Sequence, residues 1–128
     1  MALTYPVQKF IEDNVVLLEE NDLTLFFYNA FFTLTNQHST ELAHAIKDVL
    51  NIDIEPAIRE ALIDWAKDNV ALHHRKSVSV SKLLQNVPRF GYDFMSFRNM
   101  FLDAAKVAYP NKVLRPDAYG IEYLVERT

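Results

Sequence analysis

The sequence predicts an all-α fold, a single compact domain of about five to seven helices over residues 1–128. Apolar residues recur at helical spacing along most of the chain. Gly91 and Gly120 are the only glycines, so the chain has almost none of the glycine that tight hairpin turns require. A chain of 128 residues, half of them apolar, is also the size of one domain and can bury a core without disulfides.

The first predicted helix starts near Pro6, with Thr4 as its cap. Its apolar stripe continues to Leu18, which predicts one unbroken helix until Asn21 and Asp22 interrupt the pattern. Asp22 is then placed to cap the next helix, 23–34.

Helix 23–34 is apolar almost all round, which is typical of a helix that its neighbours bury. One stripe consists of Leu23, Phe26, Phe27, Ala30, Phe31 and Leu34. A second flank consists of Leu25, Tyr28 and Phe32. We therefore expect this helix to be central and to pack on helices 54–72 and 94–108.

Helical stripes predict further helices over 40–50, 54–72, 81–86 and 94–108. Ser39 is a favourable cap for helix 40–50, and Asp93 for helix 94–108. On helix 54–72, Glu55 and Arg59 are spaced to pair. Residues 77–81 and 120–126 alternate as strands do, so a minor short strand pair is compatible with the helical fold. For the last twelve residues, a short helix after Pro116 and a strand both stay open.

Charge is divided along the chain. Residues 1–72 hold twelve acidic and four basic side chains, a net charge of −8. Residues 73–115 hold eight basic and two acidic side chains, a net charge of +6. This asymmetry predicts a basic surface for an anionic partner, or else pairing of the two segments inside one fold or between copies.

Several classes of function are disfavoured by what the sequence lacks. Without cysteine there is no disulfide, thiol nucleophile or cysteine-ligated zinc. Two glycines are too few for phosphate-binding or dinucleotide-binding loops. Glu41 and His44 form one Glu-x-x-His pair, whereas a di-iron bundle needs two. We predict no catalytic residue, no metal site, no cofactor and no small-molecule substrate, and hence a protein that is not an enzyme.

The chain also lacks signals for secretion or membrane insertion. Its first residues do not have the basic-then-apolar order of a signal peptide. The longest apolar-dominated stretch, 23–34, is too short to span a bilayer as a helix. We expect a cytoplasmic protein that does not act at a membrane.

The interpretation that remains is a small non-enzymatic protein-binding or regulatory protein, with self-association into a homo-oligomer as one form of it. Nine phenylalanines and six tyrosines are many for a chain of this size to bury, and exposed apolar patches mark partner sites. In the turn after Pro88, we expect Arg89, Phe90 and Tyr92 to form an exposed anchor. A buried Phe90 is the alternative.

A nucleic-acid-binding helical module that uses the basic segment 73–98 is the alternative function. Helices 81–86 and 94–108 would form a helix-turn-helix whose second helix presents Arg98 and Asn99 to base edges. The phosphate contacts would come from Arg75, Lys76, Lys82 and Arg89.

Overall fold

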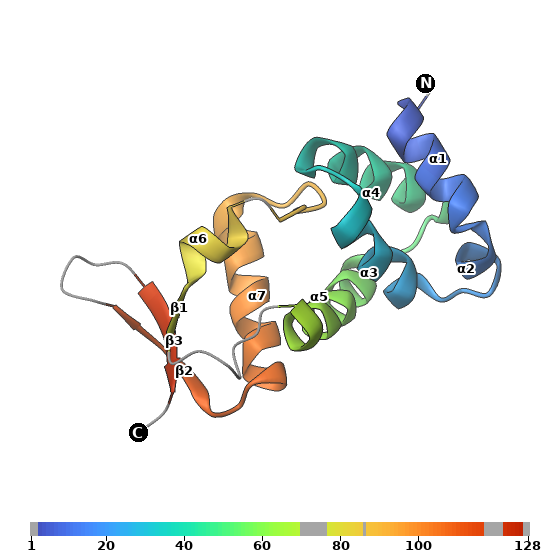
Figure 1. Ribbon diagram of the computed structural model, residues 1–128. Helices are drawn as coiled ribbons and strands as arrows, with labels where there is room; N and C mark the ends of the chain where they lie inside the picture. Colours follow the sequence, from blue (N-terminus) through green and yellow to red (C-terminus); the bar gives the residue numbers. More distant parts are fainter. Residues whose placement is uncertain (1–2, 70–76, 86, 117–121, 127–128) are drawn as a thin grey trace.

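The computed structural model describes residues 3–69, 77–85, 87–116 and 122–126, and these residues fold mainly as helices (Figure 1). The predicted all-α fold class is confirmed. The helices are α1 (Tyr5–Asp13), α2 (Val15–Glu19), α3 (Leu23–Thr33), α4 (Asn36–Leu50), α5 (Glu55–Asn69), α6 (Val80–Leu84) and α7 (Phe94–Ala108).

A three-stranded antiparallel sheet lies at the end of the molecule away from α1 (Figure 1). Its strands are β1 (Ser77–Ser79), β2 (Lys112–Pro116) and β3 (Glu122–Glu126), in the order β1-β3-β2. β1 and β3 are the strand pair that the alternation predicts, with Val78 opposite Leu124. β2 was not predicted. It is an edge strand, where a proline such as Pro116 is tolerated.

The helices pack in a different order from the one expected. α5 lies between α3 and α7, and both pack on it (Figure 1). The prediction that helix 23–34 packs on helix 54–72 is confirmed, but the prediction that it is the central helix is wrong. Only one of its two apolar flanks is buried, and Leu25 and Phe32 on the other flank stay largely exposed.

A continuous row of aromatic rings crosses the core from α1 to α7. Neighbouring ring centroids lie between 5.0 and 6.4 Å apart, mostly edge to face. Such pairs contribute beyond their buried area, so the row joins α1, α3, α5 and α7 in one core. In order, the rings are Phe10, Phe26, Phe27, Phe90, Phe31, Trp65 and Phe101.

Asn14 divides the first predicted helix into α1 and α2. Its backbone leaves the helical region, with φ −120° and ψ 16°. Its side-chain amide donates to the carbonyl of Phe10 at 2.8 Å, and its Oδ1 accepts from Asn29 of α3 at 2.9 Å. Asparagine competes with helical backbone bonds in this way. The prediction of one unbroken helix is wrong because apolar spacing does not reveal this competition.

Ser39 does not cap α4. The helix begins at Asn36, and Thr35 is its cap, accepting the N–H of His38 at 3.3 Å. Ser39 is buried within the helix, where its Oγ donates to the carbonyl of Asn36 at 2.7 Å and accepts the N–H of Phe90 at 3.1 Å. Ser39 therefore ties α4 to the connection that leads into α7.

Thr4 stands at the start of α1 but does not cap it with its side chain, because its hydroxyl donates to Glu41 of α4 at 3.1 Å. Two other predicted caps are confirmed. Asp22 accepts the N–H of Leu25 at 3.2 Å and caps α3. Asp93 accepts the N–H of Ser96 at 2.7 Å and caps α7.

Candidate protein-binding surface

Leu25 and Phe32, on the second apolar flank of α3, are exposed to solvent. Leu25 is 42% and Phe32 is 56% exposed, whereas Phe26 and Phe27 on the buried stripe are at 0%. Tyr28 is half-buried and contacts the Phe32 ring edge to face at 5.2 Å. Steps of three and four positions place these three residues in one line along the helix.

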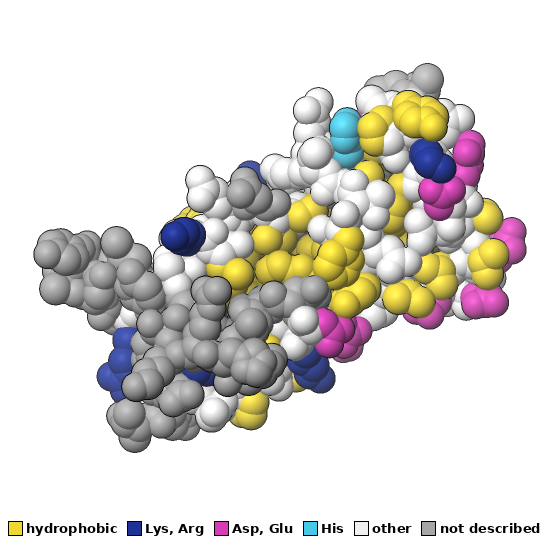
Figure 2. Space-filling model, in the orientation of Figure 1, with side chains coloured by type: hydrophobic (Ala, Val, Ile, Leu, Met, Phe, Trp, Pro, Cys, Tyr) yellow, Lys and Arg dark blue, Asp and Glu magenta, His cyan; other side chains and the backbone are white. Residues whose placement is uncertain are grey.

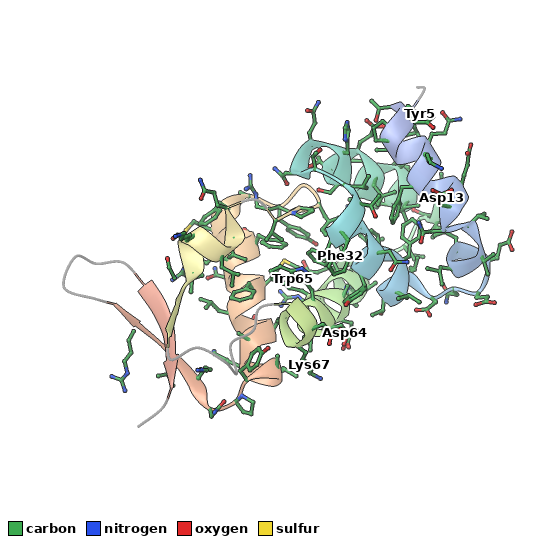
Figure 3. The ribbon with its side chains drawn as sticks, in the orientation of Figure 1. Tyr5, Asp13, Phe32, Asp64, Trp65 and Lys67 are labelled. Atoms are coloured by element: carbon green, nitrogen blue, oxygen red, sulfur yellow. The ribbon has the colours of Figure 1, made fainter. Side chains whose placement is uncertain are left out.

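Trp65 of α5 extends this apolar face. Its half-buried ring stacks on Phe31 with centroids 5.7 Å apart. Figure 2 shows a broad hydrophobic patch in the region where Figure 3 places Phe32 and Trp65. We call Leu25, Tyr28, Phe32 and Trp65 the aromatic surface. The apolar pattern identified the α3 flank, but it could not show that Leu25 and Phe32 stay exposed there.

Carboxylates border the aromatic surface. The hydroxyl of Tyr28 donates to Asp68 Oδ2 at 2.9 Å. Asp64, also exposed, lies one turn earlier on α5 (Figure 3), and Asp22 stands at the N-terminal end of α3. Lys67 is an exposed base on the same part of α5. Among the described residues, three carboxylates against one ammonium give this border a net negative charge.

The anchor predicted in the turn after Pro88 is not an exposed group. Phe90 is only 4% exposed and belongs to the row of core rings, so the buried alternative is correct. The backbone turns inward there because Phe90 and Gly91 adopt φ values of 54° and 92° in succession. A buried ring cannot reach a partner, so the prediction of an exposed Phe90 is corrected.

Arg89 and Tyr92 flank this inward turn and hold it in place. The N–H of Arg89 donates to Asn36 Oδ1 at 2.9 Å, and its guanidinium carbon lies 5.9 Å from the centre of the Phe94 ring. The hydroxyl of the half-buried Tyr92 donates to Glu55 Oε1 at 3.3 Å. Burial, followed by the nearby Glu55 carboxylate, raises the pKa of Tyr92 to about 12.

The predicted nucleic-acid contacts do not form a helix-turn-helix. α6 has five residues, and the connection to α7 runs over residues 85–93, longer than the three or four residues typical of that motif. Lys82 on α6 and Asn99 on α7 are exposed, whereas Arg98 is half-buried. Arg75 and Lys76 lie outside the described residues.

A pocket of about 190 Å³ lies beside the inward turn. It gathers an imidazole, an ammonium group and a carboxylate, which suits contact with a small polar group. Among the described residues, no set of three His, Cys, Asp or Glu side chains is placed to hold a metal ion. The pocket is lined by Ala43, His44, Lys47, Asp53, Ile54, Phe90, Gly91 and Tyr92.

On the face that Figure 2 shows, most carboxylates of the described residues lie around the end that holds α1 and α2, and several bases lie toward the end that holds the sheet. Of the ion pairs between described residues, the long-range one joins Arg59 to Asp103 at 3.3 Å. That pair links a base of the acidic segment to an acid of the basic segment, the reverse of the expected pairing.

In the part of the chain that the structure describes, no helix has both the length and the apolar character needed to cross a membrane. No family model, curated protein or solved structure matches the chain.

Proposed function

We propose that this chain is a small non-enzymatic protein-binding or regulatory protein that contacts its partner through the aromatic surface. The observation that carries the proposal is the exposed ring of Phe32, 56% open to solvent and in line with Tyr28 and Leu25. Apolar patches of this kind mark partner sites, and aromatic side chains supply much of the binding energy at interfaces. The cytoplasm is the proposed location, since a chain without cysteine suits a reducing compartment.

Photo-crosslinking from single positions tests this proposal. A benzophenone amino acid replaces Phe32 in one variant and Val49 of α4, which is 79% exposed, in the matched control. Both variants are irradiated in an extract of the native host, and the products are identified by mass spectrometry. We expect a discrete protein adduct from position 32 and none from position 49.

Two outcomes would contradict the proposal. One is equal crosslinking from both positions, which would indicate random collisions. The other is that position 32 gives no adduct in a protein that tolerates changes there. Phe32→Ala tests this tolerance, which requires that it keep the fold and lose no more than about 1 kcal/mol of unfolding free energy. Adducts between two copies of this chain would assign the surface to self-association.

A further inference from the structure

We infer that the occupant of the aromatic surface is a basic amphipathic helix of a partner protein, an inference that rests on the proposed function. α3 and α5 form this surface with side chains alone, because their backbone groups are already bonded within each helix. The backbone N–H and C=O groups of a partner segment must therefore be hydrogen-bonded within that segment itself. A helix meets this requirement, and apolar helix faces commonly dock in this way.

The length of the exposed line fits such a helix. Leu25 and Phe32 are seven positions apart on α3, which corresponds to about 10 Å along the helix axis. A partner helix would cover this distance with about two of its own turns, presenting apolar residues three and four positions apart. Trp65 on the neighbouring α5 would widen the contact beyond a single line.

The negative charge around the aromatic surface favours a positively charged occupant. Of the charged residues that the structure describes here, Asp22, Asp64 and Asp68 stand around the aromatic surface, and Lys67 lies on the same part of α5. A partner with lysine or arginine beside its apolar face would meet these carboxylates favourably. A second copy that docked through the same face would bring the same three carboxylates against them. The basic helix is therefore favoured over symmetric self-pairing.

Fluorescence of Trp65, the only tryptophan in the chain, provides a direct measurement. The probes are two amphipathic peptides of about 18 residues with the same leucine face, one with lysine on its polar face and one with glutamate. We expect the Leu/Lys peptide to shift the Trp65 emission and to bind at least about tenfold more tightly than the Leu/Glu peptide. Phe32→Ala should weaken its binding by more than about tenfold.

A matched pair of charge variants separates a local contact from general attraction to an acidic protein. Asp64→Asn with Asp68→Asn removes two charges at the aromatic surface and keeps an acceptor for Tyr28. Glu12→Gln with Asp48→Asn removes two exposed charges on α1 and α4. At about 0.15 M salt, we expect the first variant to weaken Leu/Lys binding about three- to tenfold and the second less than about twofold.

Several results would overturn the inference. Equal binding of the two peptides would exclude a basic occupant, and equal losses in the two charge variants would exclude a contact at this border. If neither peptide binds but position 32 still crosslinks to a partner, the occupant is not such a helix and the proposed function stands. If position 32 also fails to crosslink, the proposed function fails as well.

Discussion

Phe90 makes two opposed contributions to the stability of the fold, one from its ring and one from its backbone. Its ring lies between Phe27 and Phe31 and is almost fully buried, which stabilises the fold. Its φ of 54° lies in the left-handed region, where a residue with a Cβ atom costs about 1–2 kcal/mol. The ring contribution is the larger one, so the chain keeps phenylalanine where the backbone favours glycine.

Replacing Phe90 by alanine and by glycine should separate these contributions. Both variants lose the ring, with an expected loss of about 3–5 kcal/mol of unfolding free energy. Because glycine carries no Cβ atom, Phe90→Gly should be more stable than Phe90→Ala by about 1 kcal/mol. Urea denaturation of the two variants measures the difference. A more stable alanine variant would contradict the left-handed conformation at this position.

The raised pKa of Tyr92 predicts that the folded protein loses stability at alkaline pH. Its folded pKa is raised to about 12, mainly by burial and then by the Glu55 carboxylate, whereas an unfolded tyrosine titrates near 10. The folded chain therefore holds this proton more tightly. The resulting stability is complete below about pH 10 and is lost as the pH rises from about 10 to about 12.

Tyr92→Phe should reduce this alkaline dependence. Melting temperatures of the two proteins between about pH 9 and pH 11.5 provide the measurement. The original chain should lose more of its melting temperature over this range than the variant does. Parallel curves would show that Tyr92 titrates normally in the folded protein.

At the scale of the elements, hydrogen bonds from Tyr109 link the end of α7 to the end of α5. It is the C-cap residue of α7, is 8% exposed, and donates its hydroxyl to the carbonyls of Ala66 and Lys67 at 2.8 and 3.2 Å. The carbonyls in the last turn of a helix have no partner within it. This tyrosine therefore supplies a donor that α5 cannot provide for itself.

Tyr109→Phe should cost about 1–3 kcal/mol, because it leaves buried carbonyls without this donor. Tyr28→Phe is the matched control, since it also removes a tyrosine hydroxyl, but one that donates to an exposed carboxylate. Chemical denaturation gives the free energies, and hydrogen exchange should show faster opening in the last turn of α5. Equal losses in the two variants would argue against a fastening role for Tyr109.

At the scale of the whole molecule, opposite charges at the two ends should cause weak end-to-end attraction between copies. At about 10 mM salt the screening length is about 30 Å, so the acidic end of one molecule attracts the basic end of another. Light scattering should then give an apparent mass above 14.8 kDa that rises with protein concentration.

At about 0.3 M salt this attraction should be screened, and the mass should return to that of one chain. Phe32→Ala should leave the salt effect unchanged, since the attraction comes from the ends and not from the aromatic surface. An apparent mass that does not respond to salt would contradict this electrostatic origin.

The sequence predicts the features that neighbouring residues determine. α3 and α7 begin where Asp22 and Asp93 can cap them, because a cap and the apolar stripe after it are local. The break at Asn14 and the position of Ser39 depend on Asn29 and Phe90, which come from other parts of the chain. Apolar spacing cannot report such contacts.

The candidate surface was missed for the same reason. Periodicity places Leu25, Tyr28 and Phe32 on one flank of α3, but the neighbours that cover a flank are set by the packing of the whole chain. For the turn after Pro88 the error was the opposite one, because a ring that is buried was expected to be exposed. Phe90 follows a proline in a polar segment, which suggests exposure, yet a positive φ directs its ring into the core.

The strand order β1-β3-β2 has a consequence for the timing of folding. β3 is the middle strand, but it follows both of its neighbours in the chain, so it leaves the ribosome after them. Until then β1 and β2 have unpaired edges, which other chains can pair with. The helices through α7 precede β3 and can pack first, as earlier segments generally do during synthesis. The sheet is therefore the last part of this protein to form, and its outer strands are exposed to misassembly until β3 pairs with them.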